Sequence, residues 1–230
     1  MVLPLYLAQT PLEMARNPMP GRLAYLSCHF SPGGKGLSNL PEILPLGSML
    51  ILDDSTPMDG HDREWILTQL SEWIAKNQCE ALLLDFQRQN IPEQQELAKL
   101  LSDALPCPVS VSECYAEGLS CPVFLPPVPL DMPLKTYLAP WAGREIWLEA
   151  ALDGVVLTLT EAGCTAAPFF DFPEDGHSDA RLHCHYTVEP GPDSAVFRLW
   201  RTRSDLDALL ADAQVQGVTR AIGLWQELGI

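Results

Sequence analysis

The chain lacks any long apolar run. No stretch reaches the roughly 18 consecutive apolar residues that a membrane-spanning helix needs. The apolar first residues carry no basic segment, and Pro11 and Pro18 follow soon after, so we expect no signal peptide. The 7 cysteines are an odd number, and several lie in or beside apolar runs where cysteine behaves as a small hydrophobic residue. These features together predict a cytoplasmic protein.

Basic residues are scarce. The sequence has 14 Lys and Arg against 30 Asp and Glu, which gives a formal net charge of −16. A surface of this sign repels polyphosphates and anionic lipids. We therefore expect neither nucleic acid nor membrane as a partner, and composition leaves the oligomeric state open.

The usual metal-binding motifs are absent as well. The sequence contains no CxxC and no HExxH pattern. His183 and His185 flank Cys184, and on a strand their side chains would share one face, where a third ligand such as His29, His177 or a carboxylate could complete a site. The alternative is that both histidines are ordinary polar residues of a strand, and it is the one we favour. We expect no cofactor and no metal.

What the first half does contain is an alternation of strands and helices. Short apolar runs over residues 23–30, 48–53, 81–86, 109–112 and 123–125 predict strands, and helical periodicity over 63–76 and 92–105 predicts helices between some of them. Such alternation favours parallel pairing. We expect residues 1–230 to form one α/β domain, a TIM-type barrel that is compact or irregular. A doubly wound open sheet is the alternative.

The second half predicts hairpins. Asp153-Gly154 lies between apolar runs at 145–152 and 155–160, and this dipeptide favours a type I′ turn between antiparallel strands. Residues 181–189 and 194–200 predict a second hairpin. Residues 166–179 are predicted to be a loop, and a final helix over 204–216, capped by Ser204, is predicted to precede a strand over 219–225.

One strand ends in polar groups. Residues 80–87 read Glu-Ala-Leu-Leu-Leu-Asp-Phe-Gln. Alternate residues of a barrel strand face inward, so Leu83, Asp85 and Gln87 share one face. Asp85 and Gln87 then lie at the C-terminal mouth, where barrel enzymes keep their catalytic groups. Other polar or aromatic residues at predicted strand ends are Asp53, Asp54, Glu113, Tyr115, Glu149, Trp225 and Glu227.

Residues 80–87 resemble the signature strand of glycoside hydrolase family 18, the chitinase-like (β/α)8 barrels. That signature reads Asp-x-x-Asp-x-Asp-x-Glu and lies on the fourth barrel strand. The resemblance implies that Asp85 is the Asp that supports the general acid and the acetamido group of the substrate. It also places Trp225, at the end of the last predicted strand, under the sugar. Gln87 occupies the position of the catalytic Glu.

The departures from this signature predict the loss of family 18 catalysis. Glu80 and Leu83 replace the first two Asp residues, and Gln87 replaces the acid. An amide cannot donate a proton to a leaving glycosidic oxygen, and losing general acid catalysis costs typically ~10²- to 10⁴-fold in rate. A carbohydrate can still bind, because aromatic rings such as Trp225 and Tyr115 stack on sugars and carboxylates accept their hydroxyl hydrogens.

Two other functions stay open. Asp53 or Asp54 together with Asp85 or Glu113 would form a two-carboxylate hydrolase site if the carboxyl groups lay ~5–10 Å apart. Carboxylates at strand ends also commonly serve as helix caps or loop anchors. The remaining alternative is an intracellular structural or interaction protein without a small-molecule site.

Overall fold

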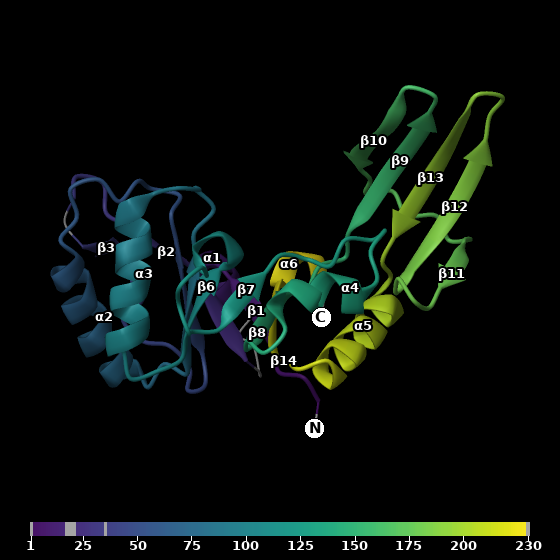
Figure 1. Ribbon diagram of the computed structural model, residues 1–230. Coiled ribbons are helices and arrows are strands. Elements are labelled where there is room, and N and C mark those ends of the chain that lie inside the picture. The colour runs from purple at the N-terminus through teal and green to yellow at the C-terminus, as the bar shows by residue number, and fades with distance from the viewer. Residues whose placement is uncertain (1, 17–21, 35, 229–230) are drawn as a thin grey trace.

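The computed structural model of the protein describes residues 2–16, 22–34 and 36–228, and its main body is a closed barrel (Figure 1). Neighbouring barrel strands are all parallel. In chain order these strands are β1 (Leu5–Gln9), β2 (Leu23–Phe30), β4 (Met49–Asp53), β5 (Ala81–Asp85), β6 (Val109–Ser112), β7 (Val123–Leu125), β8 (Ile146–Glu149) and β14 (Val218–Leu224).

Strand β1 closes the ring. It pairs with β2 on one side, where Leu7 lies opposite Leu23, and with β14 on the other, where Tyr6 lies opposite Ile222. The predicted TIM-type barrel is thus confirmed, and the open sheet is wrong. Because β1 counts as the first strand, β5 is the fourth strand of the barrel. That is the place at which the resemblance to family 18 puts the signature.

The helical layer is irregular, as predicted for this barrel. Its helices are α1 (Pro11–Arg16), α2 (Arg63–Asn77), α3 (Pro92–Ala104), α4 (Leu134–Leu138), α5 (Arg203–Val215) and α6 (Trp225–Leu228). Within the described residues, the connection from β2 to β4 contains only the two-residue strand β3 (Leu37–Ser38), and that from β6 to β7 only a 3-10 turn, Glu113–Tyr115. None of the helices within residues 2–16, 22–34 and 36–228 is long and apolar enough to span a membrane.

The start of α5 differs from its prediction. Thr202, not Ser204, is the N-cap residue: its side chain accepts a hydrogen bond from the backbone N–H of Asp205, and the Asp205 carboxylate accepts one from the N–H of Thr202. This reciprocal pair satisfies two backbone donors that a helix N-terminus otherwise leaves free. Ser204 therefore lies inside the first turn.

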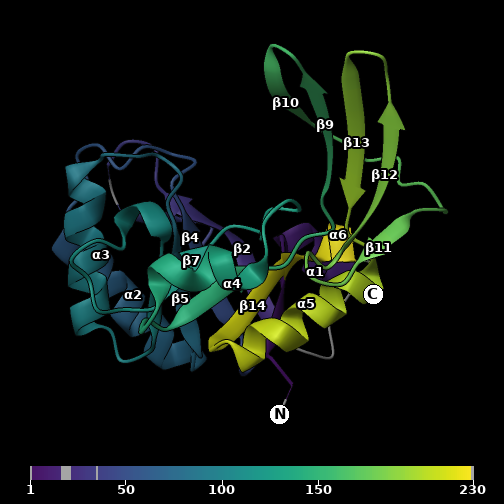
Figure 2. The same ribbon diagram turned by 45° about the vertical axis from the view of Figure 1, so that its right-hand side comes forward.

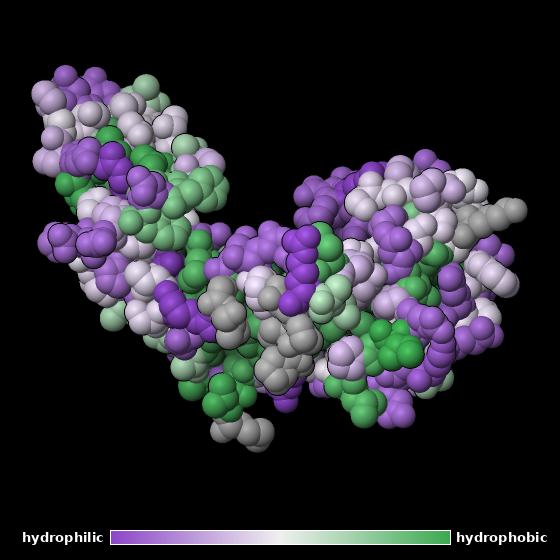
Figure 3. Space-filling model, turned by 180° about the vertical axis from the view of Figure 1, so that it is seen from behind, coloured by the Kyte–Doolittle hydropathy of each residue, from purple (hydrophilic) through white to green (hydrophobic). Residues whose placement is uncertain are grey.

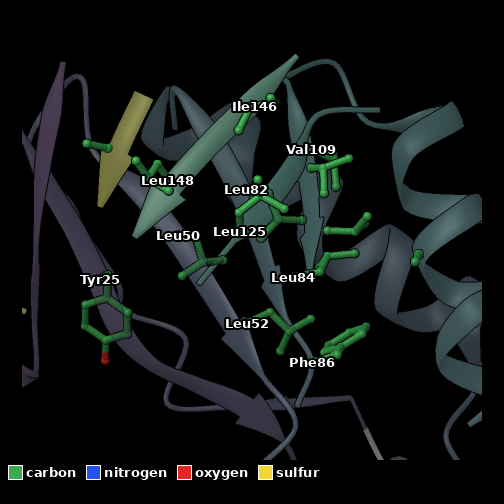
Figure 4. Close-up of a cluster of buried hydrophobic side chains, with 14 of the residues drawn as sticks. Tyr25, Leu50, Leu52, Leu82, Leu84, Phe86, Val109, Leu125, Ile146 and Leu148 are labelled. Carbon is green, nitrogen blue, oxygen red and sulfur yellow. The ribbon is translucent and has the colours of Figure 1, made fainter. Parts of the chain in front are cut away.

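Alternation along the barrel strands divides the apolar side chains into two clusters. Ala81 and Leu83 of β5 point into the barrel with Met49, Ile51 and Trp147. The next side chains of the same strands, with Leu82, Leu84 and Phe86 among them, point outward and form the larger cluster beneath the helices (Figure 4). The predicted inward face of β5 is confirmed, so Asp85 faces the barrel axis.

The hairpin predicted around Asp153-Gly154 is wrong. Residues 146–149 form β8, whose neighbours are the barrel strands β7 and β14. Gly154 begins the next strand instead of a turn, and a Cβ atom there would lie 2.3 Å from the carbonyl oxygen of Phe169. This glycine is needed for close approach of the 169–172 segment. The short run at 145–152 is apolar because a barrel strand is buried on both faces.

A second sheet is inserted between β8 and α5. Its antiparallel order is β10-β9-β13-β12-β11, and we call residues 154–200 the arm, because they project from the barrel (Figures 1 and 2). The predicted hairpin around residues 190–193 is confirmed by the pairing of β12 (Cys184–Pro190) with β13 (Ser194–Trp200). The remaining strands are β9 (Gly154–Thr160), β10 (Gly163–Pro168) and β11 (His177–Asp179), so parts of the loop predicted at 166–179 are extended strand.

The outward cluster predicts where truncation costs stability. Leu84 is fully buried, and we expect Leu84→Ala to lower the free energy of unfolding by about 2–5 kcal/mol through lost burial and a cavity. Leu46 is 75% exposed, so Leu46→Ala serves as the control and should change it by less than about 0.5 kcal/mol. Urea unfolding of both variants checks this. Equal effects would contradict the assigned packing.

Candidate functional site

The mouth of the barrel, formed by the carboxyl ends of its strands, gathers acidic side chains. Asp53 at the end of β4 lies opposite Asp85 at the end of β5 in the parallel register. Glu149 is the last residue of β8 and follows Trp147, whose side chain points into the barrel, by two positions. Two-residue periodicity therefore turns Asp53, Asp85 and Glu149 toward the same axis.

Asp85 is the centre of a hydrogen-bond network. Its Oδ1 accepts a short hydrogen bond from the side-chain amide of Gln87 and a long one of 3.5 Å from the hydroxyl of Ser112. The Ser112 hydroxyl also lies 3.2 Å from the carbonyl oxygen of Leu84. Gln87 thus uses its amide N–H to hold the neighbouring carboxylate, a contact that an ionised glutamate at this position could not make.

A small cavity opens beside this network. Its volume is about 130 Å³, and it lies where β5, β6, β7 and β8 end. The cavity offers amide, hydroxyl and carboxyl groups together with aromatic carbon. Its lining consists of Phe86, Gln87, Gln89, Ser112, Glu113, Cys114, Phe124, Pro126 and Glu149.

Glu149 has the most perturbed carboxyl group of the mouth. Burial, together with the negative charges of Asp85, Asp153 and Glu227, raises its pKa from 4.5 to about 7. Burial also raises the pKa of Asp85; the amide of Gln87 counteracts this increase, while the charge of Asp53 adds to it. Nearby negative charges disfavour the ionisation of Glu149, so at neutral pH this carboxyl group keeps a proton in part of the molecules, whereas an isolated glutamic acid would have lost it.

Asp54 is placed apart from the mouth, although it is the neighbour of Asp53. It is 3% exposed, and its two carboxylate oxygens accept hydrogen bonds from the backbone N–H groups of Gln87 and Arg88 at 3.0 and 2.9 Å. The side-chain amide of Gln94 is a third donor, at 3.1 Å. Asp54 therefore anchors the loop that follows β5. Asp53, by contrast, accepts the N–H of Ser55 at 2.9 Å near the surface.

The aromatic candidates lie in different surroundings. Tyr115 is 2% exposed, its hydroxyl donates to the carbonyl oxygen of Arg88 or the side chain of Gln94, and its ring packs edge-on against Phe86. It has no open face for a ligand. Trp225 directly follows β14, the last strand of the barrel, and is half-buried against the main core.

Of the remaining polar candidates, Glu113 lines the cavity and the two histidines contact carboxylates instead. Glu113, in the 3-10 turn after β6, is exposed and lines the cavity. His183 and His185 face separate carboxylates, Asp212 at 3.3 Å and Asp205 at 2.7 Å. Among the described residues no group of three or more His, Cys, Asp or Glu side chains is arranged to hold a metal ion.

Among the lining residues that were not singled out from the sequence, two carried a signal that could have identified them. Phe124 is the inward residue of the short strand β7, and Ser112 is the inward residue at the end of β6. The same two-residue alternation that identified Asp85 identifies both.

Comparison with known proteins finds solved structures of the same fold. The chain resembles the spore cortex-lytic enzyme SleL of Bacillus cereus (TM-score 0.57, 12% identity, 99% of this chain and 71% of that one). It also resembles a chitinase of Chromobacterium violaceum (TM-score 0.57, 9% identity, 99% and 95%). A third is the GH18 chitinase of Cycas revoluta in complex with (GlcNAc)3 (TM-score 0.57, 12% identity, 96% and 94%).

The chain has the fold of the GH18 chitinases. No family model matches the sequence, and no curated protein matches it either. At these identities the likeness shows the fold alone. It agrees with the resemblance carried by residues 80–87, since those residues lie on the fourth strand of the barrel.

The anchoring role of Asp54 predicts a loss of stability. We expect Asp54→Ala to lower the free energy of unfolding by about 1–3 kcal/mol, because it leaves the buried side-chain amide of Gln94 and two backbone N–H groups of the loop without their acceptor. Asp53→Ala, which removes one hydrogen bond near the surface, is the matched control and should cost less than about 1 kcal/mol. Urea unfolding measures both. A control as costly as Asp54→Ala would contradict the assignment.

The raised pKa of Glu149 predicts a pH-dependent stability. The native pKa of Glu149, about 7, exceeds the ordinary 4.5. The stability that its protonated form contributes below pH 4.5 is therefore lost as the pH rises through about 7. Glu149→Gln removes this loss, and we expect it to stabilise the protein by about 1–3 kcal/mol at pH 8 and to change little at pH 4.

The titration itself can be followed by carbon NMR of the Glu149 carboxyl group. We expect a midpoint near 7 and a lower midpoint in Asp85→Asn, because one neighbouring negative charge is removed. Glu72 lies on an exposed part of α2, so Glu72→Gln should leave the midpoint unchanged. A wild-type midpoint near 4.5 would contradict the electrostatic account of the mouth.

Proposed function

We propose that the protein binds a carbohydrate of the N-acetylglucosamine class at the mouth of the barrel and does not hydrolyse it by the family 18 mechanism. The observation that carries the proposal is the place of Gln87. It follows the fourth barrel strand, lines the cavity and donates its amide hydrogen to Asp85. An amide in this position holds the carboxylate but has no acidic proton for a leaving group.

The cavity offers the groups that a sugar needs. Glu113 and Glu149 accept hydroxyl hydrogens, Ser112 and Gln87 both donate and accept, and Phe124 supplies apolar surface. Its volume of about 130 Å³ is small beside the ~300–1,000 Å³ of drug-sized pockets. It therefore suits part of one ring, and the rest of an oligosaccharide would lie over the open rim. A related fold with a bound oligosaccharide is the Cycas revoluta chitinase.

Binding is tested by isothermal titration with the trimer and tetramer of N-acetylglucosamine. We expect a saturable signal for the wild type and at least tenfold weaker binding for Asp85→Ala, because the carboxylate and its hold on Gln87 are lost together. Glu72→Ala, on the outer surface of α2, is the control and should bind like the wild type. Absence of binding by the wild type would contradict the proposal and favour an interaction protein without a small-molecule site.

Catalysis is tested separately with a chromogenic N-acetylglucosaminide. We expect no turnover by the wild type. Gln87→Glu restores a carboxyl group at the acid position, and with Leu83→Asp also introduced we expect measurable hydrolysis. Turnover by the wild type that survives Gln87→Ala would contradict the assigned loss of function.

A second candidate function is hydrolysis by other carboxylates of the mouth. It is favoured by the pKa of Glu149 at about 7, a value that suits a general acid near neutral pH. Asp53, Asp85 or Glu113 would then supply the second carboxylate. In that case Glu149→Gln abolishes whatever turnover the wild type shows, whereas Gln87→Ala retains it.

A further inference from the structure

The cavity at the mouth has acidic but no basic side chains. Two of its lining residues, Glu113 and Glu149, carry carboxyl groups, and beside them the carboxyl group of Asp85 accepts the amide hydrogen of Gln87. None of the described residues that line the cavity is Lys, Arg or His. A neutral sugar gains little from such a concentration of negative charge, whereas a cation is attracted to it. The charge of the cavity therefore distinguishes between classes of sugar.

The protein supplies no opposite charge to the carboxyl groups of the mouth. Within the part of the chain that the structure describes, every ion pair involves other acidic side chains, and none involves Asp85, Glu113 or Glu149. Unpaired carboxylates near one another repel, and a bound cation relieves that repulsion. The mouth is thus electrostatically complementary to a positively charged ligand.

Two basic side chains of the neighbourhood leave this negative charge in place. Arg201 is buried, and its guanidinium group donates hydrogen bonds to two backbone carbonyl oxygens. Its positive charge favours the ionised form of Asp153. His29 lies opposite Asp53 in the register of β2 and β4 but forms no ion pair with it. Neither basic side chain lines the cavity.

Glu149 is the lining residue that most lacks an opposite charge. Its carboxyl group forms no hydrogen bond and no ion pair with another described residue. Burial raises its pKa to about 7, together with the negative charges of three acidic neighbours, Asp85, Asp153 and Glu227. Burial and the charges of Glu113 and Glu149 also raise the pKa of Tyr137, so Glu113 belongs to the same field. A cation in the cavity would favour the ionised form of Glu149.

The other lining groups suit an ammonium group, which donates three hydrogen bonds and accepts none. The amide nitrogen of Gln87 donates to Asp85, which leaves its carbonyl oxygen as an acceptor in the cavity. The hydroxyl oxygen of Ser112 is a second acceptor. The ring of Phe124 lines the same cavity, and the face of an aromatic ring attracts a cation within about 6 Å. The cavity thus combines acceptors, negative charge and an aromatic ring.

Glucosamine fits these groups better than its N-acetyl derivative does. Its nitrogen at C2 is a free amine, which carries a positive charge when it is protonated. The acetamido group of N-acetylglucosamine is neutral, donates a single N–H and takes up more of a cavity of about 130 Å³. Further rings of an oligomer have room outside the cavity, because a broad hollow with a largely hydrophilic floor lies between the arm and the main body of the barrel (Figure 3).

We propose, on the basis of the carbohydrate function proposed above, that the cavity takes a glucosamine ring with its C2 ammonium group against the carboxylate of Glu149. The site then binds de-N-acetylated oligomers more tightly than N-acetylated ones. Binding is coupled to a proton: a protonated Glu149 transfers its proton to the buffer, and the carboxylate that remains pairs with the ammonium group. A ring of N-acetylglucosamine forms no such pair and releases no proton in this way.

Affinity is measured by isothermal titration at about pH 7 and low salt, with the trimer of glucosamine and the trimer of N-acetylglucosamine. We expect the glucosamine trimer to bind the wild type at least about tenfold more tightly, and added salt to reduce this preference. Glu149→Gln should reduce the preference to about threefold or less. Glu72→Gln removes the same charge from the outer surface of α2 and should keep the preference. This control separates the cavity from the net charge of −16.

The proton is counted at about pH 6 by repeating the titration in two buffers of different ionisation enthalpy. With a pKa of about 7, Glu149 is protonated in about nine-tenths of the molecules at this pH. We expect the wild type to release roughly 0.5–0.9 proton per glucosamine trimer more than Glu149→Gln, which measures any proton that the sugar amines take up. The trimer of N-acetylglucosamine should show no such difference.

The outcomes separate the preference for glucosamine from the carbohydrate function itself. If neither trimer binds, both proposals are wrong. If the N-acetylglucosamine trimer binds as tightly as the glucosamine trimer, or more tightly, the carbohydrate site stands and the preference for an ammonium group is overturned. A preference that survives Glu149→Gln, or equal proton release by the wild type and this variant, shows that the cation binds elsewhere on the acidic surface and overturns it as well.

Discussion

The structure depends on the pairing of β1 with both β2 and β14. This strand joins the two ends of the sheet, and closure gives every barrel strand an inside and an outside. Without it the alternation along β5 would have no common axis to point to. Closure is also what brings residues as distant in sequence as Asp53 and Glu149 to one rim.

Desolvation at that rim accounts for its chemistry. Carboxyl groups that would be ionised in water are held close together at the end of an apolar barrel, and burial is the largest cause of the raised pKa values of both Asp85 and Glu149. Gln87 fits this setting because it adds a donor without adding charge. An amide at this position also avoids the repulsion that another carboxylate would cause beside Asp85.

The sequence predicted what depends on local periodicity. Two-residue alternation placed Leu83 and Asp85 on the inward face, and the fold class followed from the order of strands and helices. It could not separate Asp53 from Asp54 by role, because the donors that bind Asp54 come from residues 33 to 40 positions away. Asp153-Gly154 was misleading because the turn preference of this dipeptide is a local property. The structure has glycine at 154 because the backbone of Phe169 approaches it closely.

We propose that the mouth binds a sugar and leaves it intact, and the most direct measurement is a crystal structure of the wild type after prolonged soaking with the trimer of N-acetylglucosamine. The account predicts an uncleaved trimer with one ring in the cavity, hydrogen-bonded to Gln87 and Glu149. A trimer bound elsewhere, an empty mouth at saturating ligand, or a cleaved product in the cavity would contradict it.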